Sequence, residues 1–327
     1  MSWKAAVGKA IGRAMIHYFK GLTRWYTSPL AATLAGLILI ISNACTPLPT
    51  PSLFDAQVLD STGTAVDAPA LPGDATADTV TAQQQTGISM TGTWVLATDW
   101  SSCVVLGDAM EQRAHTLTRV TMIQEGRHLH EKRQICFLQS TPVLGQTTIF
   151  PQAALDSVGV IAVESSILGA DTHLSYAGGM EVQLWGLQLT DPLAESMPSS
   201  ATDPRIIDAD HDGLPGVTFH LGKACDMQVV QRSLAVVDAQ LGIDGKFSGG
   251  AVRSNEMYVV AGSNGLCTST FAVHANDAAN HATMVRVDAK GLNLDTDGNG
   301  EVDCAEVVAA KDQIVQFLDA DDARCTN

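Results

Sequence analysis

The chain has 327 residues, with 19 Lys and Arg against 35 Asp and Glu, and its formal net charge at pH 7 is −16. An acidic surface of this kind repels the phosphates of nucleic acids and anionic lipid head groups and attracts cations. The composition therefore excludes nucleic acid as a partner and favours a metal cation.

The first 44 residues have the pattern of an export signal. They contain five Lys or Arg residues and no Asp or Glu, and an apolar run from Leu30 to Ile41 is interrupted only by Thr33. This run is shorter than the roughly 20 residues that a transmembrane helix needs, and small residues follow it, as at a cleavage site. We predict a signal peptide over residues 1–44, with an uncleaved membrane anchor as the alternative.

The residues after the apolar run, Ser42-Asn43-Ala44-Cys45, resemble a bacterial lipobox, with Ser42 where that family usually has Leu. The resemblance implies a lipid on Cys45 and an exported lipoprotein held at a membrane, at the bacterial outer membrane, cell surface or periplasm; secretion is the alternative. Residues 46–90 contain five Pro and five Asp but no Lys, Arg or Glu. Such a segment buries too little apolar surface to offset the entropy of ordering it, so we predict a disordered tether over residues 45–90.

Residues 91–289 are predicted to form an antiparallel β domain, a sandwich or a barrel. Short alternating or β-branched segments are separated by turn residues, as in the hairpin that joins residues 117–124 to residues 127–138 through Glu125 and Gly126. Gly92-Thr93-Trp94 resembles the Gly-x-Trp of lipocalin-type barrels, which implies, as an alternative function, a barrel that binds an apolar small ligand. We interpret Trp94 as a core residue, because aromatic side chains bury well in any β core.

The sequence contains none of the common catalytic motifs: no Gly-x-Ser-x-Gly elbow, P-loop, His-Glu-x-x-His or dinucleotide fingerprint. His128 and His130 would share one strand face and could form half of a transition-metal site. The charged residues that follow them favour an exposed polar face instead. We predict a protein that is not an enzyme.

An acidic loop at residues 203–216 interrupts the β domain. Its carboxylates stand at positions 1, 3 and 5 of a calcium-loop pattern, and Gly213 stands at position 6. Position 12 is Phe219, so a closing oxygen would have to come from Asp203, a backbone carbonyl or elsewhere. Similar runs occur in calcium-stapled extracellular bacterial proteins, and a tight polar turn is the alternative. The tentative calcium ligands are Asp208, Asp210 and Asp212.

A second acidic loop, residues 295–306, has an oxygen-bearing residue wherever a 12-residue calcium loop needs one. Gly300 at position 6 permits the sharp turn, and Val302 occupies position 8. The loop closely resembles that of the EF-hand family. The resemblance implies calcium as the cofactor, bound by carboxylates, by the backbone carbonyl of position 7 and through water at position 9. The implied ligands are Asp295, Asp297, Asn299, Glu301, Asp303 and Glu306.

The residues on either side of this loop predict a loop followed by a single helix. Residues 284–294 favour a strand and a turn, whereas residues 305–318 carry an apolar stripe at helical spacing. This unit, residues 290–327, resembles half of a dockerin. We expect structural calcium that folds the helix onto the β domain, with Val308, Ile314 and Val315 buried; a dockerin-like interaction module with an exposed stripe is the alternative.

Six cysteines follow Cys45, an even number that predicts up to three disulfides in an oxidising compartment. Zinc is the rival, but no two cysteines have the short spacing that structural zinc sites prefer. Fifteen connectivities are open. A bond between Cys304 and Cys325 is one candidate, although the chain after the helix could only just span the gap. The disulfide candidates are Cys103, Cys136, Cys225, Cys267, Cys304 and Cys325.

Overall fold

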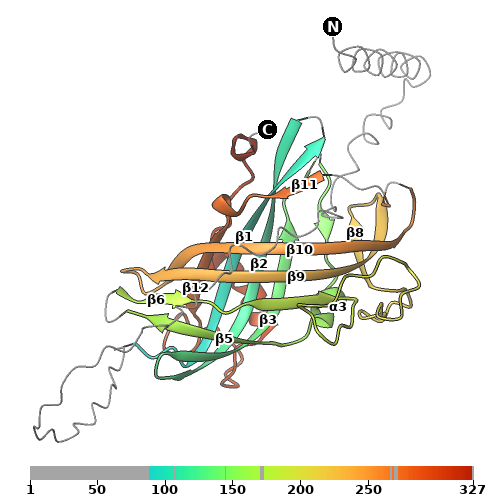
Figure 1. Cartoon of the computed structure of the whole chain (residues 1–327). Coiled ribbons are helices and arrows are strands. Elements are labelled where there is room, and N and C mark those ends of the chain that lie inside the picture. The colour runs from blue at the N-terminus through green and yellow to red at the C-terminus, as the bar shows by residue number, and fades with distance from the viewer. Residues whose placement is uncertain are drawn as a thin grey trace, which may run out of the picture.

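The computed structural model describes residues 88–325, except residues 107, 144, 170–172, 266 and 269–271 (Figure 1). The predicted signal peptide, Cys45 and most of the predicted tether lie outside the described residues. No helix within residues 88–325 is both long enough and apolar enough to cross a membrane.

The described chain is mainly antiparallel β structure, as predicted, and its strands form one 12-stranded sheet. The strands are β1 (Gly92–Leu106), β2 (Asp108–Glu125), β3 (His128–Ser140), β4 (Thr148–Ile149), β5 (Ile161–Leu168), β6 (Ser175–Ala177), β7 (Glu181–Trp185), β8 (Val217–Leu221), β9 (Cys225–Leu241), β10 (Phe247–Gly262), β11 (Ala272–Ala275) and β12 (His281–Arg286). The helical segments are α3 (Gln152–Ser157), η2 (Asp277–Ala279), α4 (Cys304–Ala309), α5 (Lys311–Ile314) and η3 (Asp322–Arg324).

The sheet closes on itself. Hydrogen-bonded neighbours run from β10 through β12, β1, β2, β3, β4 and β8 to β9, and β9 pairs again with β10. A second path joins β3 to β9 through β5 and β6. In Figure 1 the long strands β9 and β10 cross in front of β1, β2 and β3 at a steep angle. The ring therefore encloses an interior between two layers of strands.

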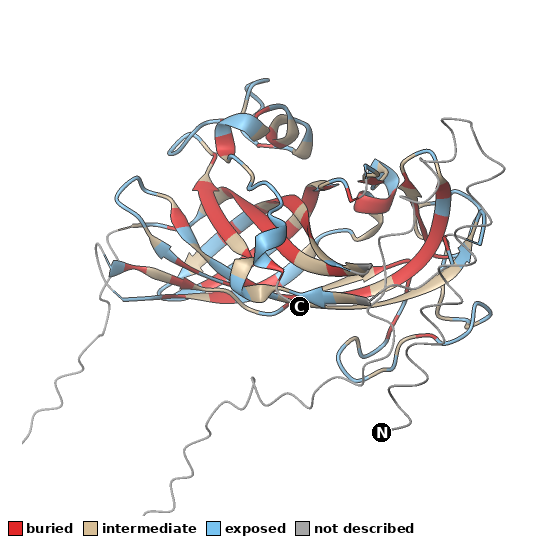
Figure 2. Cartoon of the chain, turned by 90° about the horizontal axis from the view of Figure 1, so that it is seen from above, coloured by how far each residue is buried: buried red, intermediate tan, exposed pale blue. Residues whose placement is uncertain are grey.

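Apolar side chains fill most of this interior. Trp94, only 2% exposed, packs edge-to-face on Phe247, as its interpretation as a core residue required. Its indole nitrogen donates to the carbonyl of Met90, which is fully buried in the same cluster. The predicted tether is therefore wrong at its end, because residues 88–90 belong to the folded domain. Figure 2 shows buried residues concentrated along the strands.

Strand β1 is buried on both faces. Leu96 belongs to the interior cluster, whereas its neighbours Val95 and Ala97 belong to a separate cluster on the other face, which is covered by the C-terminal residues. Because successive side chains of a strand point to opposite faces, a strand covered on both sides reads as a continuous apolar run rather than an alternating one. The C-terminal segment is thus a second layer over the outside of the β body.

The predicted helix over residues 305–318 is wrong in length. Instead, α4 and α5 are short helices that meet at Ala310, and Val315 is extended with φ −152° and ψ 149°. The chain then runs along the sheet, where Phe317 stacks on the ring of His115 at 4.6 Å. Extended residues cover more than twice the length of helical ones, so they reach further across the sheet. Contacts with the sheet therefore determine the conformation after Ile314, although the spacing of apolar residues there is helical.

The end of this segment is held by a buried carboxylate on β2. Glu111 accepts from the Ser101 hydroxyl and the Asp321 amide and forms ion pairs with Arg113 and Arg324. Burial alone would raise the pKa of Glu111, but the hydrogen bonds from Ser101 and Asp321, together with the two arginines, lower it below its usual value. Glu111 is therefore ionised at neutral pH and fixes the chain end.

Three disulfides link the six described cysteines. Cys136 of β3 pairs with Cys304 at the start of α4, with a Cα separation of 4.9 Å, and Cys103 of β1 pairs with Cys325, with a Cα separation of 5.5 Å. The third bond joins Cys225 to Cys267. The candidate pairing of Cys304 with Cys325 is wrong, because each is bonded to the β body, and both ends of the C-terminal segment are fixed to it.

Candidate metal centre

The loop of residues 295–306 is held against the β body on both sides. Leu294, directly before it, is 4% exposed, and Val302 at position 8 is 3% exposed. Val307 of α4 is fully buried in the same outer cluster. Arg119 of β2 donates to the carbonyl of Val302 at 3.1 Å. In paired EF-hands position 8 joins two loops; here Val302 packs against the sheet.

Three carboxylates of this loop converge. One oxygen each from Asp295, Asp297 and Glu306 lies within 4.8 Å of the others, although residues 296–305 separate the first from the last. These are positions 1, 3 and 12 of the predicted loop. The spacing is compatible with a single divalent cation between them, because oxygen ligands at 2.3–2.6 Å from one ion lie within about 5 Å of one another.

Backbone hydrogen bonds fix the position of Glu306. One of its oxygens accepts from the Thr296 amide at 2.6 Å and from the Thr296 hydroxyl at 2.9 Å. The other accepts from the amide of Asp303 at 3.0 Å, within a capping box that begins α4. These hydrogen bonds, first the one from Asp303, lower the pKa of Glu306. The carboxylate is therefore pre-oriented and ionised.

One oxygen of Asp295 has no partner. Oδ2 accepts from the Gly300 amide at 3.0 Å, whereas Oδ1 is inaccessible to solvent and makes no hydrogen bond among the described residues. A carboxylate oxygen that is shut away from water without a donor is costly, and a bound cation would remove the cost. The residues of the loop thus fit a metal ion.

The other predicted ligands make hydrogen bonds within the loop. The amide oxygen of Asn299 accepts from the Glu301 amide at 2.7 Å, and its nitrogen donates to Asp297 at 2.9 Å. The exposed Glu301 carboxylate is outside the group, in keeping with a ligand role for its backbone carbonyl alone. The Asp303 carboxylate caps α4 by accepting from the Glu306 amide at 2.9 Å.

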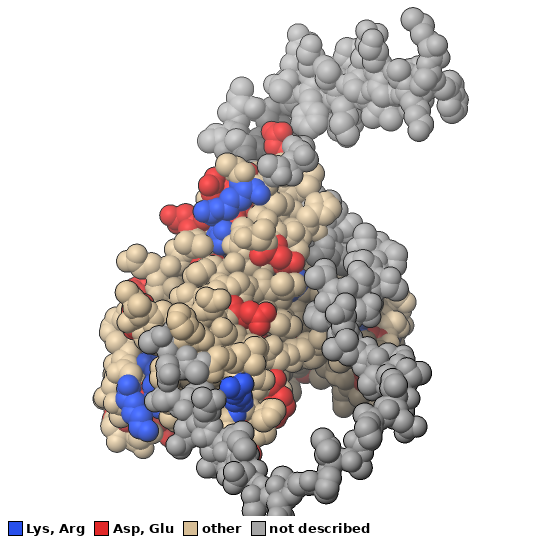
Figure 3. All heavy atoms as spheres, turned by 60° about the vertical axis from the view of Figure 1, so that its left-hand side comes forward, with Lys and Arg blue, Asp and Glu red and all other residues tan. Residues whose placement is uncertain are grey.

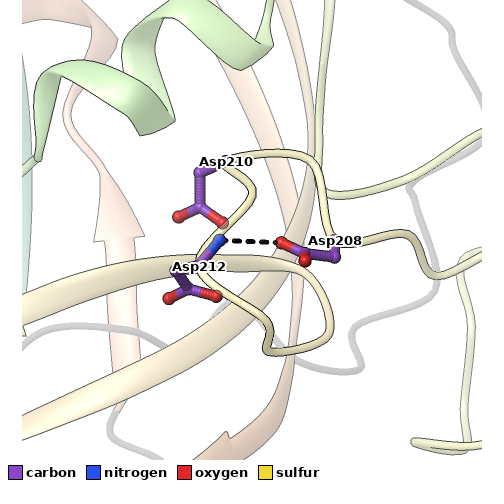
Figure 4. Close-up of side chains that lie close together, drawn as sticks. All are labelled: Asp208, Asp210 and Asp212. Atoms are coloured by element: carbon purple, nitrogen blue, oxygen red, sulfur yellow. Dashed lines mark hydrogen bonds between the residues drawn. The ribbon is translucent and has the colours of Figure 1, made fainter.

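The earlier loop brings its three aspartates together in the same way. Oxygens of Asp208, Asp210 and Asp212 lie within 4.8 Å of one another, and Figure 4 shows the side chains around a common space. The dashed line in that figure is the hydrogen bond from the Asp212 amide to Asp208, at 3.2 Å. Asp210 Oδ1 is buried without a hydrogen-bond partner within the described chain, like Oδ1 of Asp295.

Among the described residues, no fourth carboxylate joins the group in loop 208–219. Phe219 at position 12 is buried in the second interior cluster, and Asp203 forms a bidentate pair with Arg205 that lowers its pKa to about 2. Asp203, one of the closing oxygens considered from the sequence, is thus paired with Arg205 and is not among the three converging aspartates. Thr218 at position 11 donates to Asp212 from its hydroxyl and to Asp210 from its amide. The pattern gave no signal for Thr218, nor for Thr296 in the other loop.

The two loops share a backbone conformation. Positions 4 and 6 are left-handed in both, with φ of 73° and 88° at Gly298 and Gly300 and of 59° and 86° at His211 and Gly213. In both, the position-6 amide donates to position 1 at 3.0 Å. Glycine adopts a left-handed conformation without strain, whereas His211 does so at a cost. The two loops therefore have the same backbone conformation, but only loop 295–306 has a carboxylate at position 12.

The remaining candidate metal residues are exposed. His128 and His130 lie on one face of β3, as predicted, and His130 pairs with Glu164 of the neighbouring strand at 2.7 Å. On the face drawn in Figure 3, acidic side chains lie in separate places, some of them beside Lys or Arg. Within residues 88–325, the two loops are the places where three acidic groups converge.

Comparison with known proteins adds no family to this description. No protein-family model, no curated protein and no solved structure matches the chain. The resemblance of residues 295–306 to an EF-hand loop therefore stands on its spacing and on the geometry above.

Proposed function

We propose that residues 295–306 bind calcium and that the ion is structural, fastening the C-terminal segment to a non-catalytic β domain. Asp295, Asp297 and Glu306 would supply carboxylate oxygens, with Asn299 and the main chain of Glu301 completing the set. A bound calcium ion would neutralise carboxylates that otherwise repel one another.

The buried, unpartnered Oδ1 of Asp295 carries the proposal. A solvated polar turn would leave its carboxylates in water, whereas this oxygen is turned inward beside two other converging carboxylates. Hard oxygen ligands of this kind favour calcium or magnesium, and calcium tolerates an irregular ligand set better than magnesium does.

A structural role is favoured over a dockerin-like interaction module by the burial of the helices. Ile314 is 1% exposed, and Val308 and Val315 pack partly buried against the outer cluster. Most of the apolar stripe that a partner would need is therefore already in contact with the β body, although Leu318 at its end is exposed. The two disulfides at Cys304 and Cys325 fix the same segment covalently.

We extend the proposal to the loop of residues 208–212 as a weaker calcium site. Its support is the convergence of three aspartates and the buried Oδ1 of Asp210. Because Phe219 replaces the closing carboxylate and the Thr218 hydroxyl donates to Asp212, fewer protein oxygens are available there. Affinity should follow the number of charged ligands.

We further propose that the protein is exported and lipid-anchored through Cys45. The three disulfides support an oxidising compartment, since such bonds are rare in the reducing cytosol. The anchor itself rests on the lipobox resemblance. Intact mass of the protein purified from native membranes, with and without reductant, would give processing, lipidation and disulfide content together; a mass equal to the full unprocessed chain would contradict this part.

Isothermal titration with calcium tests the metal site directly. We expect two binding events of different affinity, the tighter lost in Asp295→Asn and Glu306→Gln. Glu301→Gln is the matched control, because it removes the same charge from the same loop without touching a converging carboxylate. Retention of the tighter event in Glu306→Gln, or its loss in Glu301→Gln, would contradict the assignment.

A second candidate function for the β domain, the binding of a small apolar ligand, is favoured by one observation. A cavity of about 130 Å³ lies inside the β body, so the interior is not entirely filled by side chains. This is the feature that a small-ligand carrier requires.

A further inference from the structure

The cavity lies where the two interior clusters of apolar side chains meet. Trp100 belongs to the first cluster, and Phe219 with its edge-to-face neighbour Phe150 belongs to the second; all three line the cavity. A smaller cavity of about 50 Å³ shares four lining residues with it. The shared residues are Trp100, Leu138, Gln231 and Arg253.

Arg253 of β10 is the one charged residue among the described residues that line the larger cavity. Its guanidinium carbon stands 4.7 Å from the centroid of the Trp100 ring. With the Asn255 amide turned so that its oxygen faces the guanidinium, Asn255 accepts from Nε at 3.2 Å. Within residues 88–325, the two terminal nitrogens of Arg253 make no hydrogen bond and no ion pair.

The three buried arginines of the described chain differ in this respect. Arg113 pairs with Glu111 at 2.8 Å, Arg133 pairs with Glu181 at 2.7 Å, and Arg232 pairs with a carboxylate of β10. The fold thus supplies a carboxylate for each of these three guanidinium groups. No ion pair to Arg253 forms among the described residues, and the charge of Asp277 is the acidic influence on its pKa.

Charge burial makes this arrangement unfavourable without an anion. Burial lowers the pKa of Arg253 to about 10, and Asp277 opposes that shift only in part. The group is still a cation at neutral pH, held against aromatic walls inside a protein whose net charge is −16. Arg253 is only half-buried by its accessible surface, but a guanidinium drawn partly out of water without a carboxylate partner is still unfavourable, and a carboxylate is the best partner for a planar guanidinium.

The walls also restrict the rest of the ligand. A cavity of about 150 Å³ accommodates benzene, so a space of about 130 Å³ suits a ligand of similar size, although here polar side chains line the cavity beside the aromatic ones. A bare inorganic anion would leave Trp100, Phe150 and Phe219 in contact with water, whereas an apolar body would cover them.

We propose that this cavity binds a small monocarboxylate with an apolar body of about the size of a benzene ring, and that the carboxylate pairs with the guanidinium of Arg253. The inference deepens the second candidate function, a ligand-binding β body, and is independent of calcium. Asn255 orients the guanidinium, and Trp100 stacks on one side of it.

Benzoate serves as the probe, with benzyl alcohol as its neutral counterpart of similar size, both titrated calorimetrically with and without a calcium chelator. We expect benzoate to bind with a dissociation constant on the order of 0.1 mM and at least tenfold more tightly than benzyl alcohol. Arg253→Met should weaken benzoate binding at least tenfold and leave benzyl alcohol unchanged. Arg127→Met, at the exposed hairpin turn, is the matched control and should change neither.

Two further measurements separate loss of the cavity from loss of folding. Ala114→Leu should fill the cavity and abolish binding of both probes, and Arg253→Met should melt no lower than the native protein, which shows that it folds. Equal affinity for benzoate and benzyl alcohol would overturn the role of Arg253 while sparing the ligand-binding function. Binding of neither probe at 10 mM would overturn both, and displacement of benzoate by equimolar chloride would show an inorganic-anion site instead.

Discussion

Calcium should raise the thermal stability of the whole β domain, because the proposed site is coupled to its core. Val302 lies within the loop and Val307 directly follows it, and both are buried in the outer cluster that also contains β1 side chains. Unfolding of the β body therefore destroys the site. An ion that binds only the folded state then stabilises that state by mass action.

The size of the effect follows from the affinity. Extracellular calcium modules have dissociation constants of about 0.1 to 1 mM. At 10 mM calcium, one such site contributes about 1.4 to 2.7 kcal/mol. For a folded region of this length, that corresponds to a rise in melting temperature of about 3 to 11 °C.

Thermal melts in chelator and in 10 mM calcium measure this difference for each variant. Glu306→Gln also loses hydrogen bonds in the capping box, so its melting temperature in chelator should fall; the informative quantity is the rise that calcium then produces. That rise should shrink strongly in Glu306→Gln and persist in Glu301→Gln, and 10 mM magnesium should produce a smaller rise than calcium. A melting curve of the native protein that is unchanged by calcium would refute the reasoning.

Three further perturbations test how the C-terminal segment and the earlier loop are held. Glu111→Gln should destabilise the protein by about 3 to 5 kcal/mol, because it leaves the buried Arg113 without its carboxylate. Since the pKa of Glu111 is lower in the folded state, its contribution is complete above about pH 4.5 and is lost as the pH falls through the folded pKa; urea melts from pH 3 to 6 should show a shallower pH dependence in the variant, and identical slopes would count against it. Ile314→Ala should cost about 2 to 4 kcal/mol by leaving a cavity under α5, and faster amide exchange over residues 304–325 should report it, whereas Gln313→Ala on the exposed side should not. His211→Gly should stabilise the protein by up to about 1 kcal/mol in chelator by removing the strained left-handed conformation, and a lower melting temperature would contradict that.

Much of the fold was predictable from short windows of sequence. Gly126 and Gly245 have φ of 63° and 78° and stand at the turns of the β2–β3 and β9–β10 hairpins, and the turn residues predicted the first of these turns. The two acidic loops were found from spacing alone, because glycine at fixed positions and carboxylates at alternate ones are a local requirement of the loop backbone. The antiparallel β class followed from the same local signals.

Other features depended on contacts between distant residues. The length of the C-terminal helix was predicted wrongly because its apolar stripe fits a helix, whereas contacts of Phe317 and Cys325 with β1, β2 and β3 extend the chain. Disulfide pairing was open to fifteen possibilities, and two of the three bonds join residues more than 160 positions apart.

The sequence by itself determined the local features. These are the loops with carboxylates at ligand spacing, the positions of turns, and the β-strands between the turns. The tertiary structure alone decided that Asp295 turns an oxygen away from water, that Phe219 lies in the core, and that no carboxylate among the described residues pairs with Arg253. The physical reason is the distance along the chain over which each interaction acts. Backbone conformation and loop spacing depend on neighbours in the chain, whereas burial and charge pairing depend on which distant strands the closed sheet brings together.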